Sequence, residues 1–262
     1  MKIIFIGDIV GRSGREAVIN NITYLKKNYN PEVIIANAEN AASGYGLTKK
    51  IAEDLFNIGI DVITLGNHAW DQREMLSYIE KCPRIIRAIN FPIGVPGKGD
   101  YKVKLADGRS LIVIQSMLRL FMNGSLDDPF STILNRVSSE SLGISCNGIL
   151  VDVHGEATSE KNAFAHYLDG KVTAVLGTHT HIPTADARIL ENKTAYQTDV
   201  GMTGDYNSVI GMEKENPIHG FTKGFRLEGR FKTANGKGKI CGVFIESDDK
   251  NGLAESIEAF QI

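Results

Sequence analysis

Cysteine is scarce in this sequence, and the few cysteines present are not paired. Cys82, Cys146 and Cys241 are the only three in 262 residues, they lie far apart, and none belongs to a CxxC motif. A disulfide framework or a metal site built from thiolates is therefore not expected, because both need paired or closely spaced cysteines. We expect reduced thiols in a cytoplasmic protein.

Long hydrophobic runs are missing as well. No apolar stretch approaches the roughly 20 residues that a helix needs to cross a bilayer, and the opening MKIIFIGDIV is interrupted by Asp8. That interruption comes too early for the hydrophobic region of a signal peptide. We therefore expect a protein that is neither inserted in a membrane nor secreted.

Neither sign of charge dominates. Lys and Arg total 29 against 31 Asp and Glu, a formal net charge of -2, so we expect no stable binding of nucleic acid. An anionic substrate would need a local source of positive charge.

Two sequence motifs of common enzyme classes are also missing. There is no G-x-S-x-G nucleophile elbow of a serine hydrolase. Gly7, Gly11 and Gly14 do not have the G-x-G-x-x-G spacing of a dinucleotide-binding loop.

The chain does contain short apolar runs that alternate with stretches of helical periodicity. The runs are typical of buried strands and span 2–7, 32–36, 61–65, 84–88, 111–114, 149–153 and 172–176. Helices are predicted over 15–27, 49–57, 72–80 and 129–142. Strands that alternate with helices predict a layered α/β core.

Two segments have the pattern of β-hairpins instead. Residues 101–114 carry a turn at Asp107-Gly108, and residues 225–247 carry a glycine-rich turn near 235–238. No internal repeat, low-complexity tract or linker divides the chain. We expect one domain over residues 1–262.

Five of the apolar runs end in side chains that can bind metal ions. These side chains are Asp8, Glu39 with Asn40, Asn67 with His68, His154, and His179 with His181. The carboxyl ends of strands line the binding crevice of open α/β sheets, so residues this far apart in sequence can converge. Oxygen and imidazole donors without sulfur suit zinc, iron or manganese.

Most of these residues also have an ordinary explanation when taken singly. Asp8 could form an Asx turn or cap a helix, and Glu39-Asn40 could be a solvated loop pair. Asn67 could be a left-handed turn residue, and His68 a surface or packed histidine. The segment GTHTHIP is harder to explain in this way, because an extended chain would point His179 and His181 in the same direction. Five such run ends together indicate a metal site.

Taken together, these segments resemble the calcineurin-like metallophosphoesterases, and in particular their YmdB-like branch. The resemblance covers essentially the whole chain and rests on GDIVGRSGR (7–15), NAENAASGYGLT (37–48), LGNHAWD (65–71), VDVHGEATSEK (151–161), GTHTHIPTAD (177–186) and TDVGMTGDYNSVIG (198–211). It implies an α/β/β/α sandwich with a two-metal site at the carboxyl ends of the strands.

The chain departs from the broader superfamily in two places, and the YmdB-like pattern accounts for both. The usual Asp-x-His is Asp8-Ile9-Val10 here, and Glu39 stands where the bridging aspartate is usual. The resemblance implies that Asn40 supplies the lost ligand. One ion would then be held by Asp8, Glu39, Asn40 and His181, and the other by Glu39, Asn67, His154 and His179. Iron is the implied metal, with manganese or zinc as alternatives.

The resemblance also implies an enzyme that hydrolyses cyclic nucleotides, 2′,3′-cyclic AMP or GMP and also 3′,5′-cyclic forms. Two cations roughly 3.5–4 Å apart would lower the pKa of a shared water and neutralise phosphoryl charge, and the hydroxide would attack phosphorus in line. His68 is predicted to be the general acid toward the departing ribose oxygen, or a donor that stabilises the phosphorane-like transition state. Gly11, Thr180 and His219 are candidate substrate contacts, although Thr180 could be an ordinary strand residue and His219 an ordinary loop residue.

The sequence leaves two other functions open. The same metals could serve a phosphomonoesterase or a nuclease, or the protein could bind metal and nucleotide with little turnover and act in regulation. A homo-oligomer is the default expectation for a compact protein of this kind.

Overall fold

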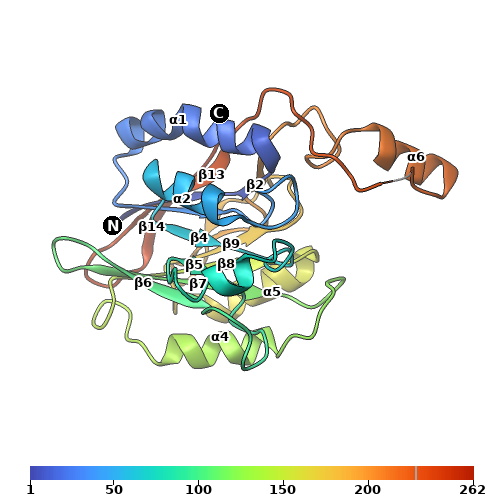
Figure 1. The fold of residues 1–262 in the computed structure, drawn as a ribbon. Coiled ribbons are helices and arrows are strands. Elements are labelled where there is room, and N and C mark those ends of the chain that lie inside the picture. The colour runs from blue at the N-terminus through green and yellow to red at the C-terminus, as the bar shows by residue number, and fades with distance from the viewer. Residues whose placement is uncertain (228) are drawn as a thin grey trace.

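The computed structural model describes residues 1–227 and 229–262 and contains two six-stranded sheets stacked face to face (Figure 1). The first sheet has the order β14 (Ala254–Gln261), β13 (Cys241–Ser247), β1 (Lys2–Ile6), β3 (Val33–Asn37), β4 (Val62–Thr64) and β5 (Ile85–Ile86). The second has the order β10 (Arg188–Ile189), β11 (Ala195–Gln197), β9 (Ala174–Thr178), β8 (Gly148–His154), β7 (Ser110–Met117) and β6 (Asp100–Lys104).

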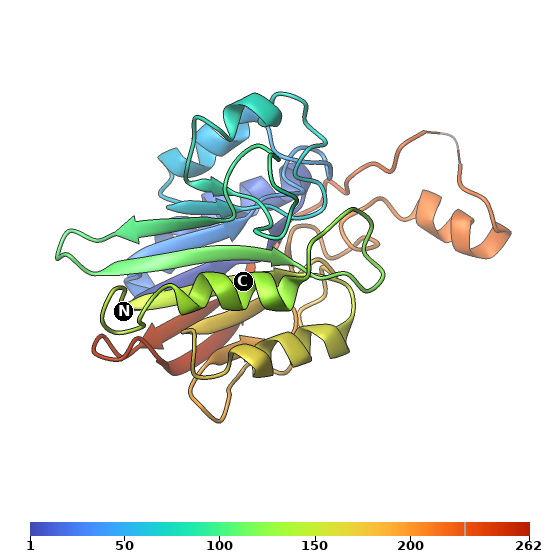
Figure 2. The ribbon, with the colours of Figure 1, turned by 90° about the horizontal axis from the view of Figure 1, so that it is seen from below.

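Helices cover the outer face of each sheet. The helices on the first sheet are α1 (Gly11–Tyr29), α2 (Lys49–Asn57) and the short α3 (Met75–Tyr78), and those on the second are α4 (Pro129–Ser138) and α5 (Thr158–Leu168). Figure 2 shows α4 and α5 lying across the outer face of the second sheet. A small parallel pair, β2 (Asp8–Ile9) with β12 (Met202–Thr203), lies beyond the end of β1.

The alternation of side chains along β1 explains why the strands form a sandwich. Ile3 and Phe5 point into the cluster between the two sheets, whereas Ile4 and Ile6 point into the cluster beneath α1 and α2. A third apolar cluster lies between the second sheet and α4 and α5. Because successive residues of a strand face opposite sides, a strand that is apolar throughout must be covered on both faces. The predicted α/β/β/α architecture is confirmed.

Capping residues determine where several helices begin and end. Thr48 accepts a hydrogen bond from the N–H of Ile51 at the start of α2, and Asp128 caps α4, which has proline at its first position. At the end of α1, Asn30 adopts a left-handed conformation with φ 45°. The predicted helix 49–57 agrees with α2, whereas the helix predicted over 72–80 is reduced to α3.

One predicted hairpin is confirmed and the other is wrong. β6 and β7 pair antiparallel around the turn at Asp107-Gly108. Within 225–240, by contrast, no described residue belongs to a strand, and β13 pairs instead with β1 and β14. The reason is burial: Val243 and Phe244 of β13 each enter one of the apolar clusters, whereas Phe225 is largely exposed and gains nothing from pairing there.

The segment that failed to form a hairpin belongs to an arm that projects from the body (Figures 1 and 2). We define the arm as residues 212–227 and 229–233; it contains α6 (Glu215–Lys223), and a bridge between Met212 and Thr233 closes its base. No helix in the described part of the chain is long and apolar enough to cross a bilayer.

Candidate metal centre

The seven candidate metal ligands meet at one rim of the sandwich. They follow β1, β3 and β4, which are parallel in the first sheet, and β8 and β9, which are parallel in the second. The carboxyl ends of all five strands therefore face the same rim, although the residues span more than 170 positions. The structure brings every one of the seven into a single network of contacts.

His154 is the centre of one half of this network. Its Nε2 lies 2.9 Å from Asn67 Oδ1, 3.0 Å from Glu39 Oε1 and 3.1 Å from His179 Nδ1. Three atoms with lone pairs thus converge on one nitrogen in a buried place, as the ligands of a cation do. These four residues are the set that the resemblance implies for one ion.

The remaining candidates form the other half. Asn40 Nδ2 lies 3.2 Å from both Glu39 Oε1 and His181 Nε2, and His181 Nε2 lies 3.9 Å from Asp8 Oδ1. His181 donates from Nδ1 to the carbonyl of Ile210, so its Nε2 lone pair faces the site. A half-turn of the Asn40 amide would present its oxygen in place of its nitrogen. Glu39 belongs to both halves, as a bridging carboxylate must.

Burial and close contact perturb the protonation of Glu39 and His154 strongly. Burial opposes ionisation of both residues, but their mutual attraction outweighs it, lowering the pKa of Glu39 to about 2 and raising that of His154 to about 9. Both ring nitrogens of His154 therefore carry protons at neutral pH when no cation is present. The Nε2 proton stabilises the converging acceptors in the way a cation would.

Burial also perturbs Asp8 and His179, two further candidate ligands, through their pKa values and hydrogen bonding. Burial raises the pKa of Asp8 to about 6 and, together with the charge of His154, lowers that of His179 to about 3. Asp8 Oδ1 is buried and has no hydrogen-bond partner among the described residues, while Oδ2 accepts from the N–H of His179. Buried oxygens are rarely left unpaired, so this orphan fits a place for a metal ion.

The sequence suggested an extended backbone at His179 and His181. The structure has a left-handed backbone there instead. His179 has φ 102° and His181 has φ 68°, values that residues with a Cβ adopt rarely. The expectation of an extended segment is therefore wrong, although both rings do turn toward the site. Strained backbone of this kind is found where the surroundings hold a functional side chain in place.

A glycine next to Asn67 leaves room for the site. A Cβ added at Gly66 would lie 2.5 Å from Nε2 of His154 and would also collide with Oε2 of Glu39. Only a residue without a side chain can pass this close to the ligands. The candidate metal centre therefore requires glycine at position 66.

Residues beneath the ligands orient His154, although the sequence pattern did not single them out. The ring donates from Nδ1 to the hydroxyl of Thr178, 2.9 Å away, and that hydroxyl donates to Asp152 Oδ1 at 2.6 Å. Asp152 is fully buried, which raises its pKa, and it also accepts from Thr64. This chain presents Nε2 of His154 to the site. The signal that could have revealed it is the aspartate inside the apolar run ILVDVH.

A buried ion pair holds the histidine loop from the other side. Lys161 of α5 donates to Asp199 Oδ2 at 2.9 Å and to the carbonyl of Thr178 at 2.7 Å. Asp199 accepts in turn from the N–H groups of Thr180 and Gly201. Lys161 and Asp199 are both fully buried, so each supplies the charge that the other requires.

His68, the predicted general acid, borders the ligands without joining them. Its backbone N–H donates to Glu39 Oε2 at 3.0 Å, and its ring donates from Nδ1 to Asp71 Oδ2 at 2.8 Å. The ring also packs edge-on against Tyr45. Asp71 thus holds the ring with Nε2 available for a proton transfer.

The three candidate substrate contacts have different surroundings. Gly11 has φ 58° and donates its N–H to the carbonyl of Asn40, beneath a candidate ligand. Thr180 lies between the two histidines, with its N–H bonded to Asp199. His219 lies on α6 and not in the loop expected from the sequence. Its Nδ1 donates to the carbonyl of Phe225, and its ring packs on that of Phe225.

Comparison with known proteins identifies the family. A model of the YmdB-like protein family matches residues 4–260. The chain belongs to this family. It is 46% identical over 262 residues to a 2′,3′-cyclic-nucleotide 2′-phosphodiesterase of Bacillus subtilis, covering all of this chain and 97% of that protein.

Two solved structures agree with this assignment. One is a hypothetical protein from Thermus thermophilus, with a TM-score of 0.91 and 40% identity, covering 100% of this chain and 99% of that one. The other is a phosphatase from Mycoplasma pneumoniae, with a TM-score of 0.91 and 34% identity, covering 100% and 93%. The predicted resemblance to the YmdB-like branch is confirmed.

Proposed function

We propose that the protein is a metal-dependent phosphodiesterase that hydrolyses 2′,3′-cyclic nucleotides. The observation that carries this proposal is the convergence of seven oxygen and nitrogen donors at one rim, with His68 beside them. The Bacillus subtilis relative, named a 2′,3′-cyclic-nucleotide 2′-phosphodiesterase, supports the substrate class. Hydrolysis would add water to phosphorus, break the bond to O2′ and leave a 3′-phosphate.

The ligands fit two cations that share Glu39. The first would be held by Asp8, Glu39, Asn40 and His181, and the second by Glu39, Asn67, His154 and His179. When bound, a metal pair in such a site lowers the pKa of water and neutralises charge on the phosphoryl oxygens. We propose iron as the metal, with manganese or zinc as alternatives. Elemental analysis of protein purified without added metal tests both the number and the kind of ion.

His68 is the proposed proton donor to the departing O2′. Asp71 accepts from Nδ1 of His68, and the backbone N–H of His68 donates to Glu39, so the ring is held in place. In its doubly protonated form, the ring can deliver the Nε2 proton to O2′ without reorienting. General acid catalysis contributes about 10²–10⁴ in rate. We expect His68→Ala to lower kcat for 2′,3′-cyclic AMP by about that factor and to keep the metal content.

The decisive assay follows 2′,3′-cyclic AMP by chromatography that separates 2′-AMP from 3′-AMP. Asp8→Ala should abolish the formation of 3′-AMP, because it removes a ligand from the first ion. His68→Ala with reduced metal content would make His68 a ligand and its assignment as acid wrong. No hydrolysis by the metal-loaded protein, under any of the three metals, would favour a binding protein with a regulatory role.

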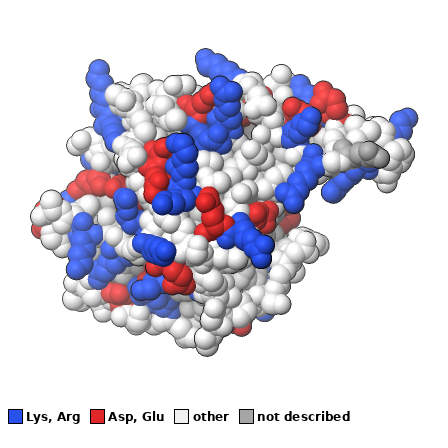
Figure 3. Space-filling view, viewed as in Figure 1, with Lys and Arg blue, Asp and Glu red and all other residues white. Residues whose placement is uncertain are grey.

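The choice between kinds of phosphoesterase needs a substrate comparison. We propose that 2′,3′-cyclic nucleotides are hydrolysed faster than 3′,5′-cyclic nucleotides, mononucleotides or oligonucleotides. A higher kcat/KM for a mononucleotide or an oligonucleotide would identify a phosphomonoesterase or a nuclease using the same ligands. Both signs of charge are scattered over the face in Figure 3, so substrate attraction is assigned to the metal site.

We also propose that the protein is a homo-oligomer built from a single domain. The arm carries exposed apolar residues, among them Ile218 at 51% and Phe221 at 89% exposure. Large exposed apolar side chains that lie together often mark association surfaces. Sedimentation velocity tests the oligomer, and a single cooperative unfolding transition of the metal-free chain tests the single domain.

A further inference from the structure

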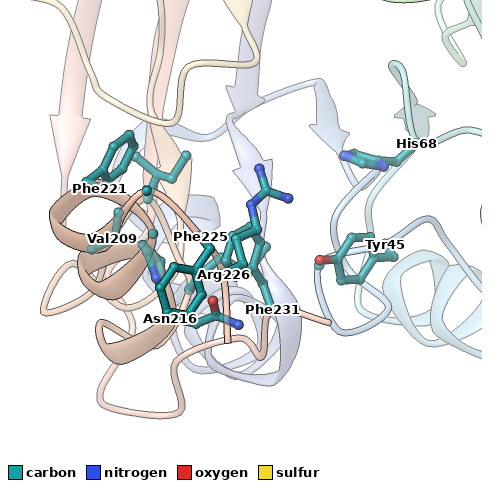
Figure 4. A pocket seen from close by; sticks show the side chains of 14 residues that line it. Tyr45, His68, Val209, Asn216, Phe221, Phe225, Arg226 and Phe231 are labelled. Atoms are coloured by element: carbon teal, nitrogen blue, oxygen red, sulfur yellow. The ribbon is translucent and has the colours of Figure 1, made fainter. Parts of the chain in front are cut away.

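A cavity of about 590 Å³ lies between the body of the protein and the arm (Figure 4). Tyr45 and His68 line it on the body side, and Phe225, Arg226 and Phe231 line it on the arm side. A volume of this size falls within the range of ordinary small-molecule sites. The cavity therefore has room for a ligand of nucleoside size.

This cavity adjoins the candidate metal centre, because three of its lining residues are bonded to candidate ligands. His68 donates its N–H to Glu39, and Ile210, another lining residue, accepts from Nδ1 of His181. Gly44, also in the lining, donates its N–H to the carbonyl of Asn40 at 3.0 Å. A molecule whose phosphate reaches these ligands can therefore extend its remaining part into the neighbouring cavity.

Aromatic rings form much of the cavity wall. Figure 4 shows Tyr45 and His68 on one side and Phe221, Phe225 and Phe231 on the other, with Arg226 reaching between them. Rings on opposite walls suit a flat, aromatic ligand, because stacking against a ring is favourable for every nucleobase.

Polar groups in the wall can meet the edge of such a ligand. The guanidinium of Arg226 lies over the ring of Phe231, 4.9 Å from its centre. Asn216 accepts the N–H of Leu227 through Oδ1, and its Nδ2 donates to none of the described residues, so Nδ2 can donate to a ligand. Both groups are donors, and all nucleobases present acceptors at their edges.

We propose that this cavity is the nucleobase subsite, with the base held between Tyr45 of the body and the rings of the arm. The proposal rests on the proposed function, since it assigns the base of the same cyclic nucleotide whose phosphodiester lies at the metal centre. The arm would then act as a specificity element that distinguishes nucleotides from other phosphodiesters. Phe231, beside Arg226, is the residue assigned to stack on the base.

The test compares two diesters that differ only in the base. 2′,3′-cyclic AMP carries adenine, and the 2′,3′-cyclic phosphate of methyl riboside carries none. Phe231→Ala should lower the ratio of kcat/KM for the nucleotide to that for the baseless diester by about tenfold, from loss of one base–ring stack. Phe231→Tyr should keep the ratio because it keeps a ring. Phe121→Ala is the matched control, since Phe121 is 85% exposed and lies outside the cavity lining.

Direct binding of adenosine separates this proposal from the proposed function. Adenosine has the base but no phosphate, so its affinity for the metal-loaded protein can be measured by calorimetry without turnover. Weaker binding to Phe231→Ala, and unchanged binding to Phe121→Ala, supports the subsite even if no diester is hydrolysed. Hydrolysis of both diesters with a ratio that Phe231→Ala leaves unchanged overturns the subsite and leaves the phosphodiesterase standing.

Discussion

Replacing Gly66 with alanine places a methyl group where two candidate metal ligands meet. The new carbon would lie 2.5 Å from Nε2 of His154 and nearer still to Oε2 of Glu39, whereas ordinary contacts are 3.4–4 Å. Glu39 and His154 are both buried, so neither ring nor carboxylate can swing into solvent to relieve the collision. The shortfall of about 1 Å must be met by moving these ligands or the backbone at position 66, which also carries the next candidate ligand, Asn67.

The expected effect is large on the site and small on the fold. Displacing a reacting group by about 1 Å costs on the order of 100-fold in rate, and overpacking one methyl group costs about 1–3 kcal/mol of stability. We therefore expect Gly66→Ala to lower kcat/KM for 2′,3′-cyclic AMP by about 100-fold and to lower metal content. The protein should still unfold cooperatively.

Gly204→Ala is the matched control for this experiment. Its added carbon would lie 3.4 Å from the nearest atom, in Val10, and neither glycine has positive φ. Elemental analysis, kinetics and thermal unfolding are measured on both variants. Two metals per chain in Gly66→Ala, with kcat/KM within a few-fold of the parent, would refute the reasoning.

Three further predictions concern the groups around the ligands. Thr178→Val keeps the shape of the side chain but removes the hydroxyl between His154 and Asp152, so metal affinity should fall by about 10- to 100-fold. Titration with metal measures the affinity, and an unchanged affinity would contradict the role of this hydroxyl. Lys161→Met leaves Asp199 charged and buried without its partner, so the free energy of unfolding should fall by about 3–5 kcal/mol. Urea unfolding measures this free energy, with Lys171→Met as the control because Lys171 is exposed. Equal stabilities of the two variants would refute the role of the ion pair. Because the metal-free protein holds His154 with a pKa of about 9, binding of a cation below that pH must release a proton, and apparent affinity should rise with pH toward 9. Calorimetry in two buffers of different ionisation enthalpy detects that proton, and its absence near neutral pH would contradict the assigned protonation.

Local sequence was sufficient to predict a layered α/β core and the candidate ligands, whereas the arrangement in two stacked sheets was implied only by the resemblance to the family. Apolar runs such as 2–7 are buried on both faces because successive side chains of a strand alternate, so each run specifies a covered strand wherever it lies in the sheet. The ligand types also follow from local information: Asp8, Glu39 and His154 each stand where an apolar run stops. Their binding of metal stays a prediction.

The groups that hold those ligands in place depended on the tertiary structure. Thr178 and Asp152 belong to neighbouring strands, and nothing in either segment alone says that one hydroxyl lies between His154 and a buried carboxylate. The same holds for Lys161 and Asp199, which are 38 positions apart and meet only because α5 packs on the second sheet.

The arm shows why local pattern can also mislead. Residues 225–247 carry the alternation and glycine-rich turn of a hairpin, yet β13 pairs with β1 and β14, since burial between two strands outweighs a local turn. Phe225 and Phe231 do not belong to the sheet, and they lie across a cavity from Tyr45. The types of the candidate ligands and the ends of the strands can be read from the local sequence. Which residues face each other across the cavity depends on the tertiary structure, because distant segments compete to pair with the same buried strand.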